Sequence, residues 1–167
     1  ARLGNALVKT GSSPAEMSWK AGVDVLTLGL TKTGAMGCEL VVLFGKAREK
    51  WGELQARAKR SGHMPPKMRF LAAQAEAMLE GGLWLDLAGR ANAKATRLAA
   101  ALIAQPGVHL AYKPDGNEVF VRLPDGLAER LTAAGAKFYP WPGGCHRFVC
   151  SWSTTDAEIA AVETAMG

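Results

Sequence analysis

One lysine stands apart from the other basic residues because its neighbours are small and nearly uncharged. The segment GLTKTGAMG, residues 29–37, places Lys32 directly after the strand-like run VDVLTL. Lysine is seldom fully buried, and the chain offers many other positions for its 20 lysines and arginines. An amine in apolar surroundings loses its proton more readily, and it then attacks aldehydes to form a Schiff base. Two interpretations of Lys32 stay open at this point, an incidental loop charge and a Schiff-base nucleophile.

The cysteines and histidines form neither a disulfide framework nor a metal site in this sequence. Cys38, Cys145 and Cys150 are odd in number and include no CxxC pair. Cys145 and His146 are neighbours, but no second pair of ligands follows at the spacing of a zinc site. We therefore expect reduced thiols, as in cytosolic proteins, and no metal.

Two strands are expected to hold Lys32 in the connection between them. Residues 23–28 and 39–44 are strand-like and nearly all apolar, which is typical of strands covered on both faces. Helices are expected at residues 1–9, 46–60, 67–79 and 83–104, with the loop SGHMPP and a Gly-Gly pair as breaks. Because one pair of strands cannot cover itself, this half is interpreted as the end of a larger α/β domain.

The second half has the pattern of a small α+β domain. Strands are expected at residues 108–112 and 118–123, around the turn PDGN, and at 137–139 and 147–152. A helix is expected at 127–134, and a capping box from Thr155 to Glu158 opens the last helix. We therefore predict two domains, residues 1–84 and residues 85–167.

Composition and charge exclude several classes of protein. The chain has 167 residues, 49% of them hydrophobic and 21% charged, which is globular. It has no apolar run of about 20 residues, no signal-peptide pattern and no initiator Met. The net charge is +5, but the densest basic stretch, residues 46–60, also carries Glu49 and Glu53 and is interpreted as a solvated helix. We expect a cytoplasmic protein that binds neither membranes nor nucleic acid.

Several blocks of the sequence, in order, resemble one enzyme family. The stretches SWKAGVDVLTLGLTKTGAMGCELVVLF and AKRSGHMPPKMRFLAAQAEAML resemble the lysine segment and the following segment of the low-specificity L-threonine aldolases. ARLGNALV is similar to the piece after that family's Asp-Gly-Ala-Arg motif, and RFVCSW is similar to its arginine-bearing strand. Together the blocks cover nearly the whole chain.

The resemblance implies a fold, a cofactor and three site residues. The fold would be the C-terminal part of a fold type I pyridoxal-phosphate enzyme: the end of the large mixed-sheet domain and a small α+β domain. Lys32 would be the Schiff-base lysine for pyridoxal 5'-phosphate. Arg2 would lie beside the cofactor's phenolic oxygen and the substrate carboxylate, and Arg147 would bind the substrate α-carboxylate, a role that suits the guanidinium fork.

The reaction implied by the resemblance is the cleavage of a β-hydroxy-α-amino acid, of the threonine or phenylserine type, to glycine and an aldehyde. The complete enzyme would be a homo-oligomer, a dimer or a tetramer. The family's aspartate for the pyridinium nitrogen would precede Arg2 by three residues, so it is absent here, as is the N-terminal half. The chain alone is therefore expected to be inactive or nearly so. The alternative is a non-catalytic fragment or interaction domain derived from such an enzyme.

Overall fold

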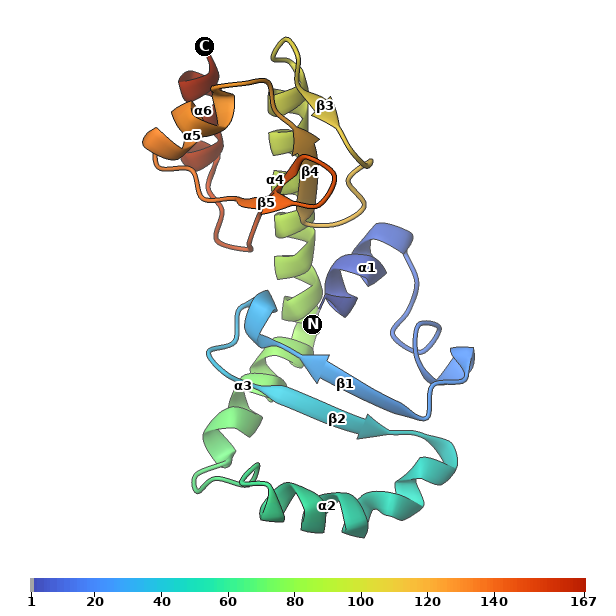
Figure 1. Ribbon diagram of the computed structural model, residues 1–167. Coiled ribbons are helices and arrows are strands. Elements are labelled where there is room, and N and C mark those ends of the chain that lie inside the picture. The colour runs from blue at the N-terminus through green and yellow to red at the C-terminus, as the bar shows by residue number, and fades with distance from the viewer. Residues whose placement is uncertain (1) are drawn as a thin grey trace. The chain divides into compact units, whose positions relative to one another are not determined.

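The structure is a computed structural model that describes residues 2–167 (Figure 1). It divides into two compact units; the first ends at Leu87 and the second spans residues 88–167. The division falls inside a long helix, near the sequence-based boundary after residue 84. The assignment of these parts to two functional domains stays a prediction. No helix in the described part of the chain is long and apolar enough to cross a membrane.

The first unit is built around an antiparallel pair of strands. Its elements are helix α1 (Leu3–Thr10), η1 (Trp19–Ala21), β1 (Val25–Gly29), η2 (Thr31–Thr33), β2 (Glu39–Leu43), η3 (Gly45–Lys50), α2 (Trp51–Arg60), α3 (Arg69–Leu79) and η4 (Glu80–Gly82). The register pairs Val25 with Leu43 and Gly29 with Glu39, so the strands form a hairpin whose connection carries Lys32. Both strands and the helices agree with the sequence-based expectation to within a few residues at their ends.

The core of the first unit joins the hairpin to the helices around it. Its buried residues are Leu7, Leu28, Leu30, Cys38, Ala75, Met78, Trp84 and Leu87. The opposite face of the hairpin stays open, since Val25 and Val41 are 51% and 43% exposed. The chain itself therefore covers one face of these strands, and the expectation that a larger domain covers the other stays a prediction.

A pair of glycines separates α3 from the long helix α4 (Leu83–Ile103). Gly81 and Gly82 have φ angles of +63° and +77°, a conformation that residues with a Cβ rarely adopt. The chain therefore changes direction between the two helices. The sequence-based break at these glycines is confirmed.

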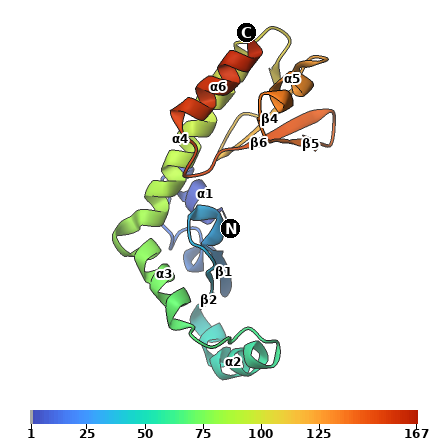
Figure 2. The same ribbon diagram turned by 90° about the vertical axis from the view of Figure 1, so that its left-hand side faces the viewer.

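The second unit packs three helices against one face of a four-stranded antiparallel sheet. After α4 come β3 (His109–Leu110), β4 (Glu118–Arg122), α5 (Leu127–Ala133), β5 (Tyr139–Trp141), β6 (Cys145–Val149) and α6 (Asp156–Met166). The strand order is β3-β4-β6-β5. The buried core combines Ala95, Leu98, Ala99 and Leu102 of α4 with residues of both central strands, of α5 and of α6. Figure 2 shows α6 running beside α4.

The expected hairpin around PDGN is confirmed, whereas the ends of the last two strands differ from the prediction. Strands β5 and β6 pair through Trp141 and Cys145, so the segment between them is a tight hairpin turn. Gly143 and Gly144 have φ angles of +79° and +70°, which suits such a turn. This turn moves β5 later and β6 earlier than the apolar pattern alone predicts.

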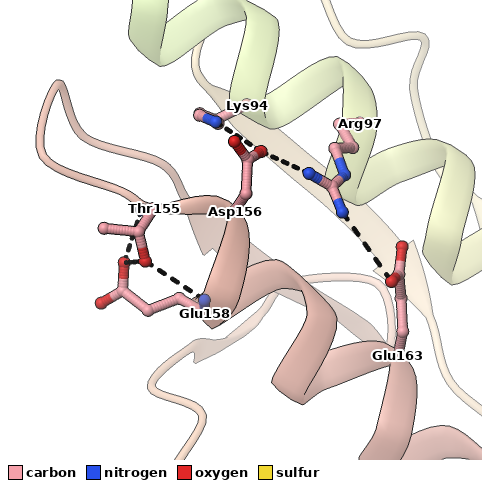
Figure 3. A network of polar contacts seen from close by, with 6 residues as sticks. All are labelled: Lys94, Arg97, Thr155, Asp156, Glu158 and Glu163. Atoms are coloured by element: carbon pink, nitrogen blue, oxygen red, sulfur yellow. Dashed lines mark hydrogen bonds and ion pairs between the residues drawn. The ribbon is translucent and has the colours of Figure 1, made fainter.

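Charged side chains connect α6 to α4 on the surface of the second unit (Figure 3). Lys94 Nζ lies 2.5 Å from Asp156 Oδ1, and Arg97 Nη1 donates to the same oxygen. Arg97 Nη2 lies 3.9 Å from Glu163 Oε2. The hydrogen bond from Lys94 is the main reason that the pKa of Asp156 lies below its ordinary value. The expected capping box is also present, because Glu158 N donates to Thr155 Oγ1 at 3.2 Å while Glu158 accepts from the backbone amide of Thr155.

The lowered pKa of Asp156 predicts a pH-dependent contribution to stability. A carboxyl group with a lower pKa in the folded state stabilises the fold above its unfolded pKa and loses this effect as the pH falls through the folded pKa. We expect Asp156→Asn to lower the urea midpoint at pH 7 and to change it little at pH 2.5. Asp125→Asn, at an exposed loop position of the same unit, is the matched control. A pH-independent difference for Asp156→Asn would contradict the role of the charge.

Candidate active site

The backbone on either side of Lys32 is fixed by one buried residue. Leu30 is fully buried, and its carbonyl oxygen accepts hydrogen bonds from Thr33 N, Gly34 N and Ala35 N at 2.9, 3.2 and 3.2 Å. Leu30 N donates to Cys38 O at 3.0 Å, which closes the turn at its other end. The turn is therefore rigid at its base.

The side chain of Lys32 lies at the surface of the first unit. It is exposed, and within the described part of the chain it takes part in no hydrogen bond or ion pair. Gly34, two residues later, has a φ of +134°, so a side chain at that position would be strained. The arrangement presents an exposed primary amine on a hydrogen-bonded turn, so the described residues do not supply the apolar surroundings considered for Lys32 from the sequence.

An acidic side chain lies at the base of the same turn. Glu39 is paired with Gly29 across the hairpin, and a Cβ added to Gly29 would lie 2.4 Å from Glu39 Oε2. Thr31 Oγ1 donates to Glu39 Oε1 at 3.4 Å. The glycine at the end of β1 therefore makes room for a carboxylate beside the lysine turn, a contact that sequence reasoning missed because it depends on the strand register.

A glutamine from α3 holds the far side of the turn. Gln74 Oε1 accepts hydrogen bonds from Met36 N at 3.0 Å and from Gly37 N at 3.3 Å. Its Nε2 group donates to the carbonyl of Phe70 at 3.2 Å, which orients the amide. No sequence pattern marks Gln74, because its partners lie 37 and 38 residues away along the chain.

Arg2 also belongs to the first unit. It lies directly before α1, where its carbonyl oxygen accepts from Ala6 N at 3.2 Å, and its side chain is half-buried. Arg2 is thus part of an ordered helix start. Its role toward a cofactor or a substrate stays a prediction.

Arg147 lies in the central strand β6 of the second unit. Residues opposite it are Phe120 on β4 and Tyr139 on β5, so it projects from the sheet face that the helices leave uncovered. Its Nε donates to Glu118 Oε1 at 2.9 Å, and its Nη2 donates to the same oxygen. The guanidinium carbon lies 5.4 Å from the centre of the Trp141 ring, within the range of a cation–π interaction.

The partners of Arg147 were not among the residues expected from the sequence. Glu118 and Trp141 lie 29 and 6 positions from Arg147, and only the antiparallel register brings the three side chains together. The alternation of β4, in which Val119 and Val121 are fully buried, places Glu118 on the outer face. That alternation could have indicated the face, although not the partner.

Two of the three cysteines, Cys38 and Cys150, do not offer a competing nucleophile. Cys38 and Cys150 are buried, and burial raises the pKa of both thiols, to about 11 for Cys150. A thiol needs its deprotonated form to act as a nucleophile, so burial keeps both thiols unreactive at neutral pH. Among the described residues, no group of His, Cys, Asp or Glu side chains is arranged to hold a metal ion.

The chain is similar in sequence to two curated enzymes. It is 44% identical over 156 residues to a low-specificity L-threonine aldolase from Pseudomonas aeruginosa, a match that covers 92% of this chain and 44% of that enzyme. It is 38% identical over 160 residues to a low-specificity L-threonine aldolase from a Pseudomonas species, covering 95% of this chain and 46% of the relative. The chain thus spans about half the length of these relatives. No family model matches it.

Solved structures show the same likeness in three dimensions. The threonine aldolase of Leishmania major matches with a TM-score of 0.84 and 26% identity, over 99% of this chain and 49% of that one. A protein from Exiguobacterium, named for aromatic amino acid β-elimination or threonine aldolase activity, matches with a TM-score of 0.70 at 16% identity and supports the fold alone. The resemblance to the threonine aldolase family and the expected fold type I architecture are confirmed.

The two hydrogen bonds that Gln74 accepts from Met36 N and Gly37 N predict a measurable effect on the turn that carries Lys32. We expect Gln74→Ala to speed the hydrogen exchange of the Met36 and Gly37 amides roughly threefold to tenfold, because a hydrogen bond contributes about 0.5–1.5 kcal/mol. Two-dimensional NMR of the labelled chain would measure these rates. Gln55→Ala, on the exposed face of α2, is the matched control. Unchanged exchange rates at both amides in Gln74→Ala would show that these two hydrogen bonds do not stabilise the turn.

Proposed function

We propose that this chain is part of a pyridoxal-phosphate-dependent aldolase that cleaves a β-hydroxy-α-amino acid to glycine and an aldehyde. The observation that carries this proposal is the exposed amine of Lys32 on a hydrogen-bonded turn directly after β1, in a chain 44% identical to part of a threonine aldolase. Threonine and phenylserine-type amino acids are the substrates to test first.

The residues present fit the cofactor at the position where its aldehyde would bond. Lys32 supplies an amine that no described group engages, and the residues that follow it, Gly34 and Ala35, are small. Pyridoxal phosphate, when bound, supplies a conjugated ring that accepts electrons from the bond broken at the substrate Cα. Lys32 Nζ is proposed to hold the cofactor through its aldehyde carbon.

The two arginines are proposed to bind and orient the amino acid. Arg147 offers a guanidinium fork whose geometry matches the two oxygens of an α-carboxylate. Arg2 is proposed to lie near the same carboxylate and the cofactor oxygen. Holding the carboxylate fixes the orientation of the Cα–Cβ bond, and this orientation selects which bond at Cα is broken.

The proposed cleavage moves one proton from the β-hydroxyl group and adds one proton at Cα. The β-hydroxyl group loses its proton, the Cα–Cβ bond breaks, and the β-carbon leaves as an aldehyde. The Cα then gains one proton, and the amino acid leaves as glycine.

We further propose that the complete enzyme is a cytoplasmic homo-oligomer, with a tetramer as the specific expectation. Large apolar side chains on the first unit support association with further polypeptide. Trp51 is 54% exposed, Phe70 57% and Val25 51%, and such surfaces are commonly covered in an assembly.

The test of the proposed function is the cofactor spectrum of the full-length gene product. We expect a visible absorption band after the addition of pyridoxal phosphate. In Lys32→Ala we expect this band to be lost and the turnover number to fall roughly 10²- to 10⁴-fold. Lys46→Ala, an exposed lysine of the same unit, should keep both. A full-length protein with no band would contradict the proposal and favour a non-catalytic protein derived from this fold.

A further inference from the structure

The guanidinium group of Arg147 is held from two sides on the outer face of the sheet. Glu118 Oε1 accepts hydrogen bonds from both Nε and Nη2, and the Trp141 ring lies against the guanidinium at 5.4 Å. The side chains of Arg147 and Glu118 are only 20% and 25% exposed. Because β6 is paired on both sides, by β4 and β5, the backbone that carries Arg147 is also fixed.

The donors that remain on Arg147 define one edge for a ligand. A guanidinium has five N–H donors, which form a side edge at Nε and Nη2 and an end edge at Nη1 and Nη2. Glu118 occupies the side edge. In the described part of the chain Nη1 donates no hydrogen bond, so the end edge is the one at which a second carboxylate finds two parallel donors.

We propose that Glu118 is a positioning residue that fixes Arg147 so that its end edge receives the substrate α-carboxylate. The inference rests on the proposed function, because it takes Arg147 as the carboxylate-binding residue. Glu118 does not touch the substrate in this account. It acts by holding the guanidinium plane, with Trp141 restricting rotation from one face.

The geometry favours a positioning role over a competing one. Glu118 uses two of the five donors, and a substrate carboxylate bound end-on needs two others, so both carboxylates bind at once. A competing carboxylate would have to occupy the edge that the substrate uses. Without Glu118, the Arg147 side chain would have to be ordered each time the substrate binds. The entropy lost in this ordering lowers the affinity for the substrate.

The test uses the full-length enzyme with pyridoxal phosphate and threonine. We expect Glu118→Ala to raise KM roughly threefold to tenfold, the cost of ordering one long side chain, with kcat changed by less than about twofold. Glu118→Gln keeps an oxygen acceptor of the same reach, so its KM should lie between those of the wild type and Glu118→Ala. Glu129→Ala, an exposed carboxylate on α5, should leave KM unchanged.

A crystal structure with glycine bound provides a second measurement of the same proposal. We expect the glycine carboxylate on Nη1 and Nη2 of Arg147, with Glu118 still bonded to Nε. Glycine bound at Nε in place of Glu118 would overturn the proposal, and so would an unchanged or lower KM in both Glu118 variants. If Glu118→Ala does not fold, the KM of Glu118→Gln and the structure of the glycine complex test the positioning role of Glu118.

The outcomes separate this inference from the proposed function. A wild-type enzyme with the cofactor band and aldolase activity, but with no effect of the Glu118 variants on KM, would remove only the role of Glu118. A wild-type protein without the band would remove the proposed function itself. The band should be unchanged in both Glu118 variants, which shows that the cofactor site is intact.

Discussion

The burial of Leu30 is the constraint on which the candidate site depends. Its side chain is completely buried in the core of the first unit, while its carbonyl oxygen accepts three successive amides and its own amide bonds to Cys38. One residue thus anchors both ends of the turn that carries Lys32. Hydrophobic burial holds the base of the turn, and the amine two residues later stays in solvent. A lysine on a mobile loop would have to be ordered along its backbone each time it reacts, whereas the backbone of this one is held by the fold.

The second unit uses a different means to fix a charged side chain. Arg147 lies on a strand that is paired on both sides, and its head group is held by Glu118 and Trp141. The uncovered sheet face also places Phe120 against Trp141, with ring centres 5.4 Å apart. An aromatic ring and an ion pair together hold the guanidinium, and Nη1 donates no hydrogen bond within the described part of the chain. The strand fixes the position of the group, and its neighbours fix its orientation.

Much of the fold could be predicted from local signals in the sequence, whereas most site contacts could not. Apolar periodicity, the Gly-Gly break and the capping box at Thr155 each depend on neighbouring residues, and the structure confirms the elements they predict. Lys32 was visible because its unusual neighbours are adjacent in sequence. Glu118 and Gln74 reach partners 29 to 38 residues away, and Glu39 depends on the register of its hairpin, so no local pattern marks these three side chains. The hairpin turn at residues 142–144 was missed because the strands beside it are short.

The most direct test of Lys32 as the cofactor-binding residue is the chemical identification of the lysine that bonds pyridoxal phosphate. The full-length gene product would be mixed with pyridoxal phosphate, reduced with sodium borohydride to make the bond permanent, and digested for peptide mass spectrometry. We expect a single pyridoxyl group on Lys32, the lysine presented by the turn after β1. A label on another lysine, or one spread over several exposed lysines with Lys32 unmodified, would contradict it.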